Sequence, residues 1–97
     1  MTTVAPVETP SVITADKERL EPPYAVILHN DDVNTMQHVV ESLMRCVSDL
    51  THEEAAEIML EAHQSGQARV IVAPHAEAAR YRNCLESRSL TATIEPA

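Results

Sequence analysis

Three short segments with the composition of β-strands are separated by two stretches that are long enough to hold helices. The strand-like segments are residues 24–29, 68–73 and 90–95, and the last alternates apolar and polar side chains. The order β-α-α-β-α-β predicts an α+β fold in a single small domain, with a three-stranded antiparallel sheet covered on one face by three helices. The apolar run at 68–73 further predicts that this segment is the central strand.

The first predicted helix is defined by a stripe of apolar side chains. These recur at i, i+3, i+4, i+7, i+8 and i+11, the spacing of a helix face that packs on a core; they are Met36, Val39, Val40, Leu43, Met44 and Val47. Asn34 and Gln37 have the spacing of a capping box, so the helix is expected to start at Asn34 or Thr35.

The second and third predicted helices have clear boundary residues. Thr51 and Glu54 form a strong capping box, and Gly66, the only glycine, stands where a left-handed C-terminal residue belongs. We therefore expect the second helix to end at about Ser65. Pro74 suits the start of a third helix over residues 75–87.

Composition limits the class of protein. Residues 1–21 contain prolines and little apolar periodicity, which predicts a flexible N-terminal tail before a domain at 22–97. A net charge of −8 without a basic patch argues against nucleic acid and anionic membrane as partners. The absence of a bilayer-length apolar run and of a targeting signal predicts a cytoplasmic protein, in which Cys46 and Cys84 are free thiols.

The segment His29–Met36 joins the first strand to the first helix and is rich in hydrogen-bond acceptors. One interpretation is an Asx turn with a helix cap, in which Asn and Asp bond their own backbone. The other is a ligand site. Asn30, Asp31 and His63 offer acceptors beside an apolar wall, which suits a primary ammonium next to a hydrophobic side chain, as at a peptide's free N-terminus. The wall would consist of Met36, Val39, Met59 and Ala62.

Two other classes of function compete with a peptide pocket. A metal could be bound by His29, Asp31, Asp32, His38 and His63, although no known metal-binding spacing is present. A metal-dependent or small enzyme would use His29, Asp31 and His63. A single glycine excludes the phosphate-binding loops of nucleotide enzymes. The same order of elements is also similar to the C-terminal domain of the ribosomal stalk protein, an interaction domain that would have no such pocket.

Two motifs make one family resemblance specific. Asn-Asp-Asp at 30–32 and Met-x-x-x-His-x-x-Gly at 59–66 occur in the order found in the ClpS adaptor family, and the resemblance covers residues 22–97. Details of the sequence are most similar to the cyanobacterial and chloroplast branch. The resemblance implies a monomeric, non-enzymatic adaptor without a cofactor. It would bind N-degrons that begin with Leu, Phe, Tyr or Trp and deliver them to the N-terminal domain of a Clp AAA+ unfoldase, ClpC or ClpA, for degradation by ClpP.

The resemblance also implies a role for individual residues. Asn30, Asp31 and His63 would hold the α-amino group, and Met36 would reject β-branched residues. The side-chain pocket would be lined by Asn34, Met36, Val39, Met59, Ala62 and Leu90. Asn34 and Ala62 depart from the Thr and Val of many relatives. Ala76 replaces a Glu used for docking on the unfoldase, so docking is expected at Glu77 and Tyr81.

Overall fold

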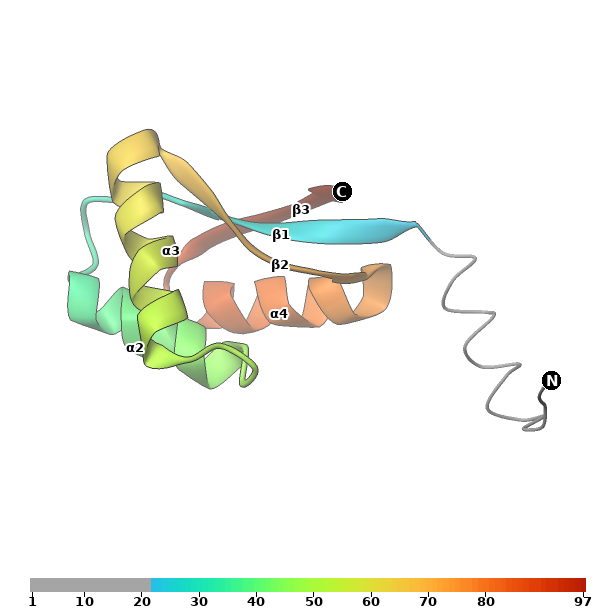
Figure 1. Cartoon of the computed structure of the whole chain (residues 1–97), viewed down its shortest axis with the longest axis horizontal. Helices are drawn as coiled ribbons and strands as arrows, with labels where there is room; N and C mark the ends of the chain where they lie inside the picture. Colours follow the sequence, from blue (N-terminus) through green and yellow to red (C-terminus); the bar gives the residue numbers. More distant parts are fainter. Residues whose placement is uncertain (1–21) are drawn as a thin grey trace, which may run out of the picture.

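The computed structural model describes residues 22–97, and the predicted tail at 1–21 lies outside them. The elements, in chain order, are β1 (Pro23–His29), α2 (Met36–Cys46), α3 (His52–Ser65), β2 (Gln67–Pro74), α4 (His75–Ser87) and β3 (Thr91–Pro96). This is the predicted β-α-α-β-α-β order, and the described residues form a single α+β domain (Figure 1).

The three strands form one antiparallel sheet in the order β2-β1-β3. The prediction that residues 68–73 form the central strand is therefore wrong, because β1 occupies the centre. Four successive residues of β1, 25–28, are buried, as expected for a strand with a neighbour on each side. In β2, by contrast, Arg69 is exposed and Val72 is 42% exposed. The apolar run in β2 reflects one covered face of an edge strand.

The helices lie on one face of the sheet and enclose the core with it (Figure 1). Large buried side chains come from the strands and from α2 and α4, whereas α3 contributes the small side chains of Ala55 and Ala62. Small residues let helix backbones approach closely, which fits a core that contains no Phe or Trp. The largest fully buried aliphatic side chains are those of Val26, Leu43, Val47 and Leu85.

The boundaries of α2 and α3 test the predicted caps. Thr35 caps α2, since its hydroxyl oxygen accepts from the backbone N–H of His38 at 3.1 Å. The expected capping box of Asn34 and Gln37 is wrong, because the Asn34 side chain turns into the loop. For α3, the Thr51–Glu54 capping box is present, and Gly66 ends the helix with φ of 93°. Both predictions for α3 are confirmed.

The two cysteines form a disulfide between α2 and α4, so the expectation of free thiols is wrong in this structure. The Cα atoms of Cys46 and Cys84 are 5.6 Å apart, a usual separation for a disulfide. Each residue lies beside the inward face of its helix, and the packing of α2 against α4 brings the two together. None of the helices among residues 22–97 is long and apolar enough to cross a bilayer.

Candidate functional site

The loop after β1 is organised by the carboxylate of Asp31. Its Oδ1 accepts from the backbone N–H groups of Val33 and Asn34, both at 3.0 Å, as in an Asx turn. The Asn34 side-chain amide donates to both carboxylate oxygens at 3.2 Å. These hydrogen bonds, first of all that from the Asn34 backbone, lower the pKa of Asp31 below its ordinary value. Asp31 therefore carries a full negative charge at neutral pH.

Asn34 also fastens this loop to the turn between α4 and β3. Its Nδ2 donates to the backbone carbonyl of Ser89 at 2.8 Å. Ser89 has a φ of 72°, a left-handed conformation that reverses the chain, and Leu90 follows it. One amide side chain thus links the acceptor loop to the segment that supplies Leu90.

The C-terminal end of α3 is joined to the same loop from the other side. The backbone N–H of Asn30 donates to the carbonyl of Gly66 at 2.9 Å. Since Gly66 caps α3, this bond places the last turn of the helix, with His63, beside Asn30. Within residues 22–97, the side chains of Asn30 and His63 make no hydrogen bond to protein, which leaves their polar atoms available to a ligand.

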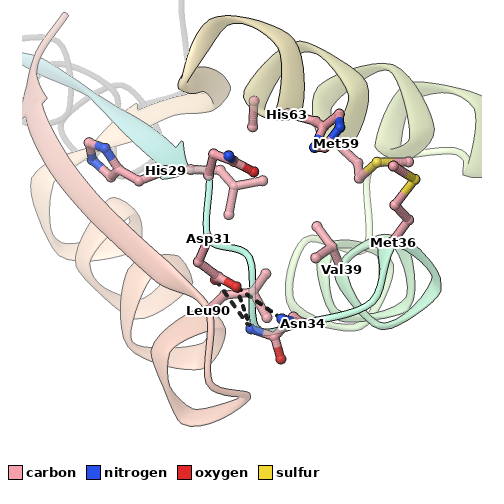
Figure 2. Close-up of a pocket in the computed structure, with 11 residues that line it drawn as sticks. His29, Asp31, Asn34, Met36, Val39, Met59, His63 and Leu90 are labelled. Atoms are coloured by element: carbon pink, nitrogen blue, oxygen red, sulfur yellow. Dashed lines mark hydrogen bonds between the residues drawn. The ribbon is translucent and has the colours of Figure 1, made fainter.

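These three segments, together with the first turn of α2, enclose a pocket of about 370 Å³, including its open mouth (Figure 2). All nine residues predicted from the sequence for the two halves of the site line it. Asn30, Asp31 and His63 are among them, as are the six expected pocket residues Asn34, Met36, Val39, Met59, Ala62 and Leu90. The structure brings the predicted site residues together, while their roles stay predictions.

Leu28 and His29 also line the pocket and were not predicted to do so. Leu28 is the last buried residue of β1 before the loop, and its position at the end of the strand is the signal that could have identified it. The His29 imidazole lies within hydrogen-bonding distance of the Thr93 hydroxyl, with Nε2 and Oγ1 2.8 Å apart. This contact ties the rim of the pocket to β3.

Polar and apolar side chains alternate around the pocket, since His63 lies beside Met59 and Leu90 lies beside Asp31 (Figure 2). Asp31 lies on one side, and Met36 and Met59 lie on the other (Figure 2). Ala62 and Leu90 are only 3% and 4% exposed, so they form part of an apolar interior, whereas Met36 is 48% exposed at the mouth. Acceptors beside an apolar cavity suit a ligand that brings hydrogen-bond donors attached to a hydrophobic group.

The histidines and acidic residues proposed for a metal site do not converge. Among residues 22–97, no three His, Cys, Asp or Glu side chains are grouped so as to hold a metal ion. His29 contacts Thr93, and the His38 ring lies 2.7 Å from the carbonyl oxygen of Arg88 on the far side of α2. The described residues therefore give no support to a metal site. The pocket itself argues against an interaction domain like that of the ribosomal stalk protein, which was expected to have none.

The two predicted docking residues lie outside the pocket, on α4. The Tyr81 hydroxyl donates to the Glu77 carboxylate at 2.9 Å, and both side chains are half-buried. This hydrogen bond, with burial and the Glu77 charge, raises the pKa of Tyr81 above its ordinary value. Tyr81 is therefore neutral at physiological pH and holds the Glu77 carboxylate against the helix.

Comparison with known proteins agrees with the fold and with the sequence resemblance. The family model described as "ATP-dependent Clp protease adaptor protein ClpS" matches residues 19–93. A Clp protease adapter ClpS from Synechococcus elongatus is 43% identical over 83 residues, which are 86% of this chain and 87% of the relative. A chloroplastic adapter, CLPS1 from Chlamydomonas reinhardtii, is 40% identical over 82 residues, or 84% of this chain and 51% of that protein.

Solved structures include one with the same fold. The structure of Agrobacterium tumefaciens ClpS2 bound to L-phenylalaninamide has a TM-score of 0.74 and 24% sequence identity, and the match covers 78% of this chain and 98% of that one. At this identity the likeness concerns the fold. The family model matches most of the chain, and the Synechococcus and Chlamydomonas adapters share 43% and 40% sequence identity with it. The chain therefore belongs to the ClpS family of ATP-dependent Clp protease adaptor proteins.

Proposed function

We propose that the pocket binds the free N-terminus of proteins that begin with Leu, Phe, Tyr or Trp, and that the protein delivers these substrates to a Clp unfoldase. The observation that carries the proposal is the meeting of Asn30, Asp31 and His63 with an apolar cavity in a single pocket. A substrate of this class has an ammonium group and a large apolar side chain on the same carbon atom. The pocket offers a partner to each.

The α-ammonium group has three N–H donors and no acceptor, so it needs acceptors on several sides. The Asn30 amide oxygen and a neutral His63 imidazole nitrogen can each accept one hydrogen bond. The Asp31 carboxylate supplies the negative charge, and its Oδ2 accepts only one hydrogen bond within the loop, from Asn34. Its remaining lone pair can face the ammonium, and the Asx turn fixes the direction of the carboxylate before a ligand arrives.

The substrate side chain would enter between Val39, Met59, Ala62 and Leu90. Met36 stands over the mouth, where it would contact the substrate at Cβ. A second branch at Cβ, as in Ile or Val, would collide with it there. We therefore expect Met36→Ala to admit peptides that begin with Ile or Val. Unchanged rejection of these peptides would refute the gate.

The solved structure with the same fold supports the choice of ligand. That structure has L-phenylalaninamide bound, a molecule with a free α-amine and an aromatic side chain. The same combination of a donor cation with a large apolar group is what the pocket described above suits. The two chains share 24% identity, so the ligand reaches this protein as a proposal.

Delivery requires a second surface. We place it on α4 at Glu77 and Tyr81, away from the pocket, so that substrate and the N-terminal domain of the unfoldase, ClpC or ClpA, can be bound together. On this proposal the protein acts as a monomeric, non-enzymatic adaptor in the cytoplasm, and ClpP carries out the proteolysis. Reducing conditions there would favour the thiols of Cys46 and Cys84 over the disulfide.

Fluorescence anisotropy with three labelled peptides tests the proposal: one that begins with Leu, one with Ile, and an N-acetylated form of the Leu peptide. We expect only the first to bind. Acetylation removes the charge and two of the three donors, so tight binding of the acetylated peptide would overturn the proposal. Asp31→Ala should weaken binding of the Leu peptide by about 1.5–3 kcal/mol, the range for hydrogen bonds to charged groups. An unchanged affinity would contradict this role of Asp31.

A further inference from the structure

A second apolar depression lies next to the pocket, between α2 and α3. We call it the α2–α3 groove. It measures about 710 Å³ including its open side, and its lining residues are Met36, Gln37, Val40, Glu41, Met44, His52, Ala56 and Met59. Its floor is apolar, whereas the exposed Gln37, Glu41 and His52 form a polar rim.

The groove is continuous with the pocket. Met36 and Met59 line both hollows, and their side chains lie close to each other between α2 and α3 (Figure 2). Each methionine thus has one side toward the N-terminal residue of a substrate and the other toward the groove. A substrate chain that leaves the pocket past Met36 would therefore have the groove directly on the other side of these two side chains.

The composition of the groove suits a variable apolar ligand. Three methionines, Met36, Met44 and Met59, line it. Methionine is unbranched and polarizable, so surfaces rich in it adapt to apolar side chains of different shape. Proteins selected by their first residue alone differ at every later position, so a subsite for a later residue has to tolerate such variety.

The geometry of an extended peptide selects the position. Successive side chains of an extended chain point to opposite sides, and those two residues apart point to the same side about 6.6 Å from each other. The first side chain of a substrate can therefore lie in the pocket while the third lies in the groove, with Met36 and Met59 between them.

We propose that the α2–α3 groove binds the apolar side chain of the third residue of the substrate. This inference rests on the proposed function of the pocket.

The test uses four labelled peptides that all begin with Leu, on the unmodified protein. They are Leu-Ala-Leu, Leu-Ala-Asn, Leu-Leu-Ala and Leu-Asn-Ala, each followed by the same polar sequence. Asn has nearly the outline of Leu but loses hydrogen bonds to water when it is buried. We expect Leu at the third position to bind about five- to tenfold more tightly than Asn, which corresponds to about 1–1.4 kcal/mol. The second position should show no such preference.

Matched variants on α3 locate the effect. Ala56→Gln places a longer polar side chain in the groove and should abolish the preference for Leu at the third position. Glu57→Gln changes an exposed neighbour outside both hollows and should leave the preference intact. The peptide series on the unmodified protein decides the question even if Ala56→Gln fails to fold.

Each result has one meaning. If all four peptides bind with equal affinity and acetylation abolishes binding, the pocket functions as proposed and the groove is not a subsite. A preference at the second position instead of the third also overturns the inference. If binding does not depend on the free amine at all, the proposed function itself fails, and the groove inference fails with it.

Discussion

Helix α2 is held in different ways on its two flanks. Toward α4 it is fixed by directional bonds: the Cys46–Cys84 disulfide, the contact of His38 with the Arg88 carbonyl at 2.7 Å, and the bond from Arg88 Nε to the Ser42 hydroxyl at 2.8 Å. Toward α3 it meets the methionines of the α2–α3 groove, and within residues 22–97 no side-chain hydrogen bond joins the two helices.

The pocket lies between these flanks and combines their properties. Leu90 and Asn34 belong to the fixed side, since Asn34 is bonded to the Ser89 carbonyl next to Leu90. Met36 and Met59 belong to the adaptable side. A rigid wall can define the depth of a pocket, while unbranched methionine side chains adjust to the ligand. The comparison leads us to expect large stability effects on the α4 flank and specificity effects on the α3 flank.

The largest effect on stability is expected from the disulfide. Replacing Cys46 and Cys84 by Ser opens a loop of 38 residues. Loss of a cross-link of this span costs about 2–4 kcal/mol of unfolding free energy. Urea denaturation of the oxidised protein and the double variant measures the difference. A reductant should lower the stability of the disulfide-bonded protein and leave that of the double variant unchanged. Equal stability of the two proteins without reductant would show that the disulfide does not fix this flank.

The next effect concerns Ser42, whose side chain is fully buried. Arg88→Met keeps the apolar stem but removes the Nε–H donor from the Ser42 hydroxyl. The hydroxyl then keeps only a longer contact, 3.4 Å to the His38 ring, and a buried polar group that loses its main partner costs about 1–3 kcal/mol. Because Ser42→Ala removes this hydroxyl, the double variant should be more stable than Arg88→Met alone. A double variant that is less stable than Arg88→Met would contradict the pairing.

Gly66 tests the junction between α3 and the acceptor loop. It has a left-handed φ of 93°, and a Cβ added there would meet no atom within 4 Å. Gly66→Ala should therefore destabilise through backbone conformation alone, by about 1–2 kcal/mol. Thermal unfolding measures this. Gln67→Ala, at the exposed neighbouring position, is the control; an equal effect of both substitutions would contradict the argument.

The smallest effect is a pH dependence that comes from Asp31. Its folded-state pKa lies below the ordinary value of 3.8, so its ionisation stabilises the folded state above that pH. The contribution is lost as the pH falls through the folded-state pKa. The stability difference between the native protein and Asp31→Asn should thus shrink from pH 6 to below pH 3. A difference that stays constant over this range would show that Asp31 does not have the lowered pKa.

The sequence predicted local features well because each depended on neighbouring residues. The Thr51–Glu54 capping box and the Gly66 cap involve residues a few positions apart, and the apolar stripe of α2 has a regular period. Most pocket residues were named from hydrogen-bonding chemistry and helix spacing, and the family resemblance added Asn34 and Leu90. For the caps and the stripe, the information lies within one element; for the pocket, it lies in the chemistry of separate short segments.

The features that were missed depend on packing between distant segments. Whether β1 or β2 is central depends on which strands pair, and the apolar content of one strand does not reveal this. Cys46 and Cys84 meet only because α2 packs on α4. Asn34 had the spacing of a cap, but Thr35 took that role, and the Asn34 amide found partners in Asp31 and, 55 residues away, the Ser89 carbonyl.

The central claim is that one pocket reads a free amine and an apolar side chain together. Two-dimensional NMR of the labelled protein, titrated with L-leucinamide and with N-acetyl-L-leucinamide, tests it most directly. With leucinamide we expect shifts of the Asn30 side-chain amide, the His63 ring and the Met36 and Met59 methyl groups, and none at Ser42 on the fixed flank. The acetylated ligand should shift none of these signals. Equal shifts with both ligands, or shifts without Asn30 and His63, would contradict the claim.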